Sequence, residues 1–418
     1  MISSWFGLRL GTGTLMLGGL LLAGVAGCGS PVAQFKSNVV FVAVQENQQD
    51  AVKVGDRASQ ISDVLGAMFG TPDAPYVPEL AEIDTKTVLD VNRLKMAAGP
   101  VGASTHLNPQ GLYREHCAHC HGVTGDGMGP TAAFLNPYPR DYRPGKYKFK
   151  STPVGARPTH ADLTKTLMEG IPGTAMPSFR LLPADEVEAL VQYVKYLSIR
   201  GEVERDLITT VATEMDAGAP LIDLTKKPEL TEQLDLIKSK ATTSFTAWAN
   251  AGTEITAIPA KSASVDEDHE ASIARGRLLF YTVAACNKCH GDSAQGDGQT
   301  NDYDVWTKEL SPDKPELLKE YLELGALPPR NILPRNLRQG IYRGGRRPID
   351  IYWRVMNGIE GTPMPGLKSN VLNEGDAPDP KKLTQDDVWH LINYVRSLPY
   401  DSISNPPEYD PNFQRDRN

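Results

Sequence analysis

The cysteines are the feature that most constrains what this chain can fold into. Its 418 residues contain only five, Cys28 alone and two close pairs, Cys117 with Cys120 and Cys286 with Cys289. A histidine follows each pair at once, so both segments have the pattern C-x-x-C-H. A disulfide scaffold of this length would need more cysteines, scattered more widely. The pattern therefore indicates two equivalent sites rather than a cross-linked fold.

C-x-x-C-H is the attachment motif of c-type haem. The two thiols would bond to the porphyrin, and the histidines that follow, His121 and His290, would supply the proximal nitrogen to iron. A zinc site would need four ligands, whereas the two pairs lie 169 residues apart. A redox-active disulfide would not require a histidine at the same position twice. We therefore expect two covalently bound haem c groups, each with its iron.

A second iron ligand is expected later in each half of the chain. The segments GIPGTAMP and GIEGTPMP share the pattern G-I-x-G-T-x-M-P and contain Met176 and Met364. Glycine and proline favour an irregular loop that presents the methionine without helical constraint, and a thioether ligand raises the haem potential. The alternatives are that both methionines only fill the core, or that His160 and His390 ligate. Neither histidine recurs in the other copy.

These motifs resemble those of class I cytochrome c domains, and the chain resembles a tandem dihaem cytochrome. The resemblance implies a mainly α fold in which a first helix precedes C-x-x-C-H and a last helix crosses the first. Residues 187–197 and 388–398 match the last helices, with apolar positions at i, i+3, i+4, i+7 and i+10. The match covers about residues 100–200 and 270–400.

We therefore expect two cytochrome c-like helical domains in tandem, with an N-terminal extension and a helical linker. The expected parts are a lipoprotein signal peptide (1–27), the extension (28–99), a first unit (100–204), the linker (205–265), a second unit (266–400) and a tail (401–418). Outside the motifs, the pattern predicts a strand-like run at 39–44 and helices near 58–69, 229–249 and 315–324.

The internal repeat extends to PRDYR at 139–143 and PRNLR at 334–338. Arginine binds carboxylates in fork geometry, so Arg140 and Arg335 are candidate partners of haem propionates, with ordinary surface arginines as the alternative. The family usually offers a backbone carbonyl from a proline-containing loop to the proximal histidine. Pro130 marks that loop in the first unit, and the second lacks a proline there. We therefore expect the two histidines to have different surroundings.

The second unit carries two inserts, at about residues 301–333 and 368–382. The first is rich in proline and charge, and the second has the composition of a loop. An insert near a haem edge would shape a docking surface; the alternative is that both are solvated loops.

The first 28 residues predict export. One basic residue, Arg9, precedes an uncharged apolar run, and the segment ends in VAGC at Cys28, which resembles the bacterial lipobox. The alternatives are a plain secretory signal or an uncleaved anchor helix, although about 17 apolar residues are few for a spanning helix. We expect Cys28 to carry lipid that holds the protein on the periplasmic side of a bacterial membrane.

Composition excludes some classes of protein. The chain is 40% hydrophobic and 22% charged, which is ordinary for a globular protein and unlike a disordered or collagen-like chain. A net charge of −8 argues against a nucleic-acid binder.

An iron ligated by histidine and methionine has no open position for a substrate. The resemblance therefore implies an electron carrier in an extracytoplasmic respiratory chain, with redox proteins as donor and acceptor, and no enzyme activity. The alternatives are a cytochrome subunit of a larger oxidase or quinol-oxidising complex and, less favoured, a dihaem peroxidase, which needs one accessible iron.

Overall fold

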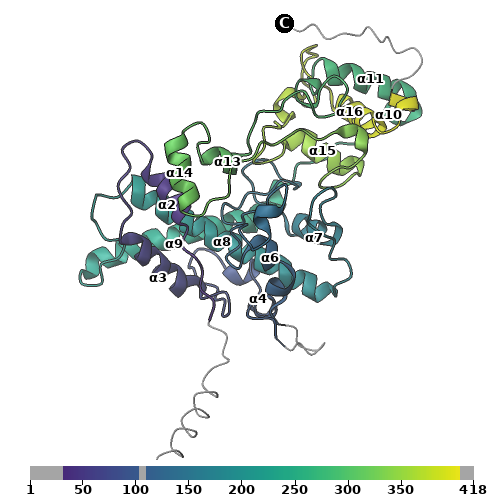
Figure 1. Ribbon diagram of the computed structural model, residues 1–418. Coiled ribbons are helices and arrows are strands. Elements are labelled where there is room, and N and C mark those ends of the chain that lie inside the picture. Colours follow the sequence, from purple (N-terminus) through teal and green to yellow (C-terminus); the bar gives the residue numbers. More distant parts are fainter. Residues whose placement is uncertain (1–31, 103–109, 405–418) are drawn as a thin grey trace, which may run out of the picture.

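The computed structural model describes residues 32–102 and 110–404 (Figure 1). Helices joined by long loops make up this part of the chain, where β pairing is limited to isolated bridges between single residues. The mainly α fold class is thus confirmed. Cys28, the signal segment and the tail beyond residue 404 lie outside the described residues. No helix in the described ranges combines the length and apolar composition needed to span a bilayer.

Helix α8 (Ala184–Thr213) is the centre of the first unit. It begins after Pro183 with two acidic residues in its first turn, where they face the positive end of the helix dipole. The predicted last helix at 187–197 is only its first part, because α8 continues through Thr213. Burial of charge requires pairing, and Arg200 Nη1 on this helix lies 2.8 Å from Glu204 Oε2.

The N-terminal extension wraps around α8. Helices α2 (Val39–Glu46), α3 (Arg57–Phe69) and α4 (Val91–Ala97) all contact it. The strand-like expectation for residues 39–44 is wrong, since this segment forms α2. The Asn38 side chain caps it by accepting from Phe41 N, at 3.4 Å. Packing against α8 together with this cap outweighs the β propensity of its valines.

Helix α9 (Lys227–Asn250) follows in the linker and also packs on α8. Its position agrees with the helix predicted at 229–249. Its buried face carries Phe245 and Trp248.

The second unit is built on α11 (His269–Tyr281) and α16 (Gln385–Ser397), which pack closely against each other. Gly276 permits the close approach, because a Cβ there would lie 1.9 Å from His390 O. Thr384 caps α16 by accepting from Asp387 N at 3.1 Å, as the polar start of this helix predicts. Helix α15 (Pro348–Asn357) also packs on α16.

The insert at residues 301–333 packs on the first half of the chain instead of extending into solvent. It contains α13 (Val305–Glu309) and α14 (Pro315–Glu323), and α14 lies beside α2 (Figure 1). Tyr138 OH donates to Pro328 O at 3.0 Å, and Arg330 donates to Leu135 O at 2.6 Å. The insert thus connects the second unit to the first half of the chain through packing and hydrogen bonds.

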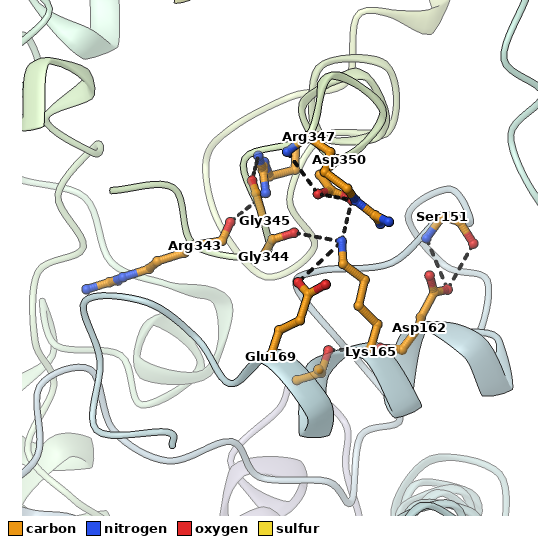
Figure 2. A network of polar contacts seen from close by, with 11 residues as sticks. Ser151, Asp162, Lys165, Glu169, Arg343, Gly344, Gly345, Arg347 and Asp350 are labelled. Carbon is orange, nitrogen blue, oxygen red and sulfur yellow. Dashed lines mark hydrogen bonds and ion pairs between the residues drawn. The ribbon is translucent and has the colours of Figure 1, made fainter. Parts of the chain in front are cut away.

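A second set of contacts joins the units through α7 (His160–Glu169) and α15. Figure 2 shows Lys165 of α7 reaching Asp350 of α15 and the Gly344 carbonyl, 3.3 Å from its Nζ. Lys150 and Glu360 form a further ion pair between the units, and both side chains are buried.

Candidate functional site

The two C-x-x-C-H segments have the same local structure. Each forms one helical turn, α6 (Ala118–His121) and α12 (Asn287–His290), closed by a glycine in the left-handed region. All four motif cysteines are free thiols. Burial raises the pKa of Cys117 and that of Cys286 to about 12. The Cys117 and Cys286 thiols are therefore neutral, and all four cysteines remain available for thioether bonds.

A backbone carbonyl orients each proximal histidine. His121 Nδ1 lies 3.0 Å from Arg140 O, and His290 Nδ1 lies 3.0 Å from Arg335 O. A carbonyl only accepts, so Nδ1 carries the hydrogen and Nε2 is left with a free lone pair. Burial lowers the pKa of His121 to about 4 and lowers that of His290. Both rings are thus held as neutral imidazoles, the form that ligates iron.

This corrects the expectation based on Pro130. The carbonyl comes from the residue after Pro139 in the first unit and after Pro334 in the second. Both units use the same device, so the difference expected from the missing proline in the second unit is wrong. The repeated Pro-Arg dipeptide is the sequence signal for this carbonyl, which belongs to the same arginines whose side chains are the candidate propionate partners.

A real difference between the two histidines lies in their ring packing. The His121 ring stacks on Tyr142, with centroids 4.7 Å apart and 19° between the planes. The repeat places Leu337 at the position equivalent to Tyr142. His290 instead has Phe280 nearby, at 6.5 Å and 48°.

The methionine loops are built alike. In the first, Ile171 N donates to Met176 O (3.1 Å), and Thr174 Oγ1 both donates to Ile171 O (2.8 Å) and accepts from Met176 N (3.1 Å). The second loop makes the same three bonds through its equivalent residues, at 3.2, 2.7 and 3.2 Å: Ile359, Thr362 and Met364. The shared pattern G-I-x-G-T-x-M-P thus encodes one loop conformation used twice.

A hollow in the first unit brings the predicted site residues together. Its empty volume is about 1340 Å³, and its wall includes the predicted residues Cys117, Cys120, His121, Arg140 and Met176. Two thiols, an imidazole and a thioether around one mostly apolar hollow fit a covalently attached haem. The predicted alternative His160 lies elsewhere, with its Nε2 2.8 Å from Glu188.

In the second unit the local structures of the two segments recur, and the Nδ1 of His290 lies 3.0 Å from Arg335 O. The alternative ligand His390 is engaged elsewhere, because its Nδ1 lies 2.8 Å from Ser272 Oγ.

The two predicted propionate partners lie where the units meet. The Arg140 guanidinium stacks on the Trp306 ring of the insert, 3.8 Å from its centroid. Arg335 lies near Gly173 of the first methionine loop, since a Cβ there would be 3.7 Å from Arg335 Nη1. Their role toward propionates stays a prediction.

Sequence reasoning missed two further cations. The repeat continues without gaps as PRDYRPGKYK and PRNLRQGIYR, and its last position is Lys148 in one copy and Arg343 in the other. Both residues line the first hollow. Extending the repeat by five residues marks both positions, although it does not show that Arg343 lies at the hollow of the other unit.

Comparison with known proteins agrees with this arrangement. The protein-family model described as Cytochrome c matches residues 108–198 and 273–399, which contain both C-x-x-C-H segments and both methionine loops. A chain of the reducing HAO-like protein complex of Kuenenia stuttgartiensis is 23% identical, with a TM-score of 0.43; the match covers 69% of this chain and 94% of that one. No curated protein sequence matches the chain.

Proposed function

The chain belongs to the cytochrome c family, a membership that implies covalently bound haem c, and on this premise we propose that it carries two haem groups and transfers electrons between redox proteins. The haem iron supplies the one-electron chemistry. The observation that carries the proposal is the duplication of the whole local arrangement: thiol pair, carbonyl-bound histidine and hydrogen-bonded methionine loop.

Each unit has a defined set of residues for this task. Cys117 and Cys120 tether the first haem, and Cys286 and Cys289 tether the second. The remaining lone pair on Nε2 of His121 and of His290 would hold the iron of each haem together with a thioether, that of Met176 in the first unit and that of Met364 in the second. An iron held by both ligand types would supply electron transfer and would leave no position for a substrate.

Location is a further part of the proposal. Lipidation of Cys28 would attach the protein to a bacterial membrane on its periplasmic side, where an extracytoplasmic respiratory chain supplies donors and acceptors. The support is the small-residue segment before Cys28 and the apolar run that precedes it.

The test uses the full chain expressed with haem c maturation. We expect two haems per chain, methionine–iron charge-transfer absorption in the oxidised protein, and two components in a redox titration. Met176→His and Met364→His should each move one component to lower potential, because histidine is a weaker stabiliser of reduced iron than a thioether.

The matched controls are Met168→Leu and Met356→Leu, which alter methionines that pack in or against the hydrophobic cores. They should leave both components in place. Bis-histidine spectra in the unaltered protein, or peroxidase activity with a five-coordinate spectrum, would contradict the proposal.

A further inference from the structure

One residue of the second unit lines the hollow of the first. Arg343 lies there together with Arg140 and Lys148 of the first unit. None of the described residues that line this hollow is acidic. Three cations therefore converge on a space that is otherwise mostly apolar.

The charge of Asp304 in the insert acts on Arg140 and on Lys148 without forming an ion pair with either. Within the described residues, none of the three forms an ion pair within 4 Å, and the Nε of Arg343 is buried without any hydrogen-bond partner. Burial, and then Arg140, lower the pKa of Lys148 to about 7; burial, and then Arg335, lower that of Arg343 to about 10. All three side chains are half-buried, and half-buried cations without an ion-pair partner are costly, so the arrangement favours an anion in the hollow.

Both units hold Arg343 in place. Its carbonyl accepts from Arg354 Nη1 at 2.6 Å, and the next residue, Gly344, accepts from Lys165 of the first unit at 3.3 Å. Its side chain extends away from this network (Figure 2). At its far end, Nη2 donates to Gly173 O in the first methionine loop at 3.3 Å. The guanidinium is thus positioned before any ligand binds.

We propose that Arg343 of the second unit binds a propionate of the haem attached to the first unit, beside Arg140 and Lys148. A guanidinium can use several donors on a carboxylate at once, and Arg343 uses only Nη2 within the protein. The inference rests on the proposed function only in that a haem fills the first hollow. It makes the docking of the second unit part of the first haem site.

The expected consequence is electrostatic. A cation near a haem favours the reduced iron, which carries one positive charge fewer, so Arg343 raises the potential of the first haem. A guanidinium bonded only to Gly173 O would still act on the first haem by its charge, so the substitution Arg343→Lys, which keeps the charge, separates that effect from binding of a propionate.

The test is a redox titration of the fully loaded protein carrying Arg343→Gln. Met364→His as a background moves the second haem to lower potential, so that the first is observed alone. We expect Arg343→Gln to lower the reduction equilibrium constant of the first haem about tenfold, which is about 59 mV for one electron. The second haem, titrated in a Met176→His background, should change less than about twofold.

The matched control is Arg346→Gln, which removes the same charge from the same loop. Arg346 is exposed, and its Nη2 donates to Tyr400 OH at 2.9 Å. It should shift the first haem less than about twofold. Equal effects of the two substitutions, or a larger effect of Arg343→Gln on the second haem, would overturn the inference.

If Arg343→Gln does not yield haem-loaded protein, a second variant tests the same inference. Arg343→Lys keeps the charge but loses the fork, so we expect a two- to fivefold decrease in the same equilibrium constant. An unchanged first component in Arg343→Lys would then refute the assignment. Haem count and methionine–iron absorption of the unaltered protein test the proposed function separately. If both are as expected and Arg343→Gln has no effect, this inference alone fails.

Discussion

At the scale of single residues, the two proximal histidines share a hydrogen bond to a backbone carbonyl and differ in the packing of their rings. Both donate Nδ1–H to a carbonyl at 3.0 Å, which fixes the tautomer and the basicity of each ring equally. Only His121 stacks on a tyrosine. Differences between the two sites therefore come from ring packing and nearby charge, since the hydrogen bond is the same.

The glycine that opens each methionine loop gives a prediction at this scale. Gly170 and Gly358 have φ of +66° and +74°, and a Cβ would lie 2.6 Å from Pro177 C and 2.7 Å from Gly366 N. Alanine there would cost about 1–2 kcal/mol in backbone strain alone and would meet backbone that has no room to move. We expect each substitution to remove methionine–iron absorption from one haem.

Gly66→Ala is the control for these two variants, because a Cβ there meets nothing within 4 Å and the residue lies inside α3. It should leave the absorption unchanged. Full methionine–iron absorption in Gly170→Ala and Gly358→Ala would show that these loops tolerate a side chain.

The residues that carry covalent or coordination chemistry could be predicted from sequence, because only cysteine, histidine and methionine can perform it. The carbonyls of Arg140 and Arg335 could not, since every residue has one and no side chain marks its use. Arg343 was missed for another reason: its partner site belongs to the other unit, and repeat comparison alone places it in its own.

At the scale of secondary structure, periodicity predicted helices well where one face is buried. The helices expected at 58–69, 229–249 and 315–324 agree with α3, α9 and α14 within a few residues. The failure at 39–44 has a physical cause. The run VVFVAV at 39–44 is continuously apolar and rich in valine, a pattern that fits a strand, although tertiary packing on α8 makes the segment helical.

Glu202 connects α8 to α9 through hydrogen bonds, and no pattern in the sequence predicts this contact. Its carboxylate accepts from Arg157 Nη2 at 2.9 Å, Ser244 Oγ at 2.7 Å and Trp248 Nε1 at 2.9 Å. Glu202→Gln removes the negative charge that pairs with Arg157. It also places an amide NH2 group, which is a donor, among side chains that themselves donate. We expect it to destabilise the first unit by about 3 kcal/mol.

Fluorescence of Trp248 during urea denaturation measures this effect, since unfolding moves the indole away from its carboxylate partner and from the nearby haem. Glu232→Gln is the control, because Glu232 is exposed on the same α9. Equal midpoints for the two variants would show that the Glu202 network adds little.

At the scale of the whole molecule, the two units behave as one because contacts between them are buried and charged. Asp350 lies at the centre of one such contact, facing Lys165, Arg347, Arg354 and, through Lys165, Glu169. The insert supplies a separate contact through Arg330 and Tyr138. A tandem repeat alone does not predict this docking, which depends on an insert present in one copy only.

Acid should weaken this docking. Burial would raise the pKa of Asp350, but hydrogen bonds from Arg347 and Lys165 outweigh it and hold the pKa below its usual range. A lowered folded-state pKa contributes stability that is present above the unfolded value of about 3.9 and is lost as pH falls through the folded value.

We therefore expect the radius of gyration from small-angle scattering to stay constant from about pH 8 to 5 and to increase below about pH 4. Asp350→Asn should be more extended at neutral pH and should show a smaller change with acid. Glu374→Gln, at an exposed residue, is the control. An identical acid response in Asp350→Asn would assign the transition to other carboxylates.

If docking delivers Arg343 to the first haem, then loosening the interface at a distance should mimic loss of that arginine. Lys165→Met removes the partner of the buried Asp350 carboxylate, though Arg347 remains at 2.9 Å, so about 1–2 kcal/mol of docking free energy should be lost. The first haem potential should fall in the same direction as in Arg343→Gln. Because both substitutions act through one contact, the first haem potential of the double variant should fall no further than that of Arg343→Gln alone.

Lys238→Met, on the exposed side of α9, is the control for Lys165→Met. Additive shifts would mean that Lys165 and Arg343 influence the first haem independently, and the first site would then not depend on how the second unit docks.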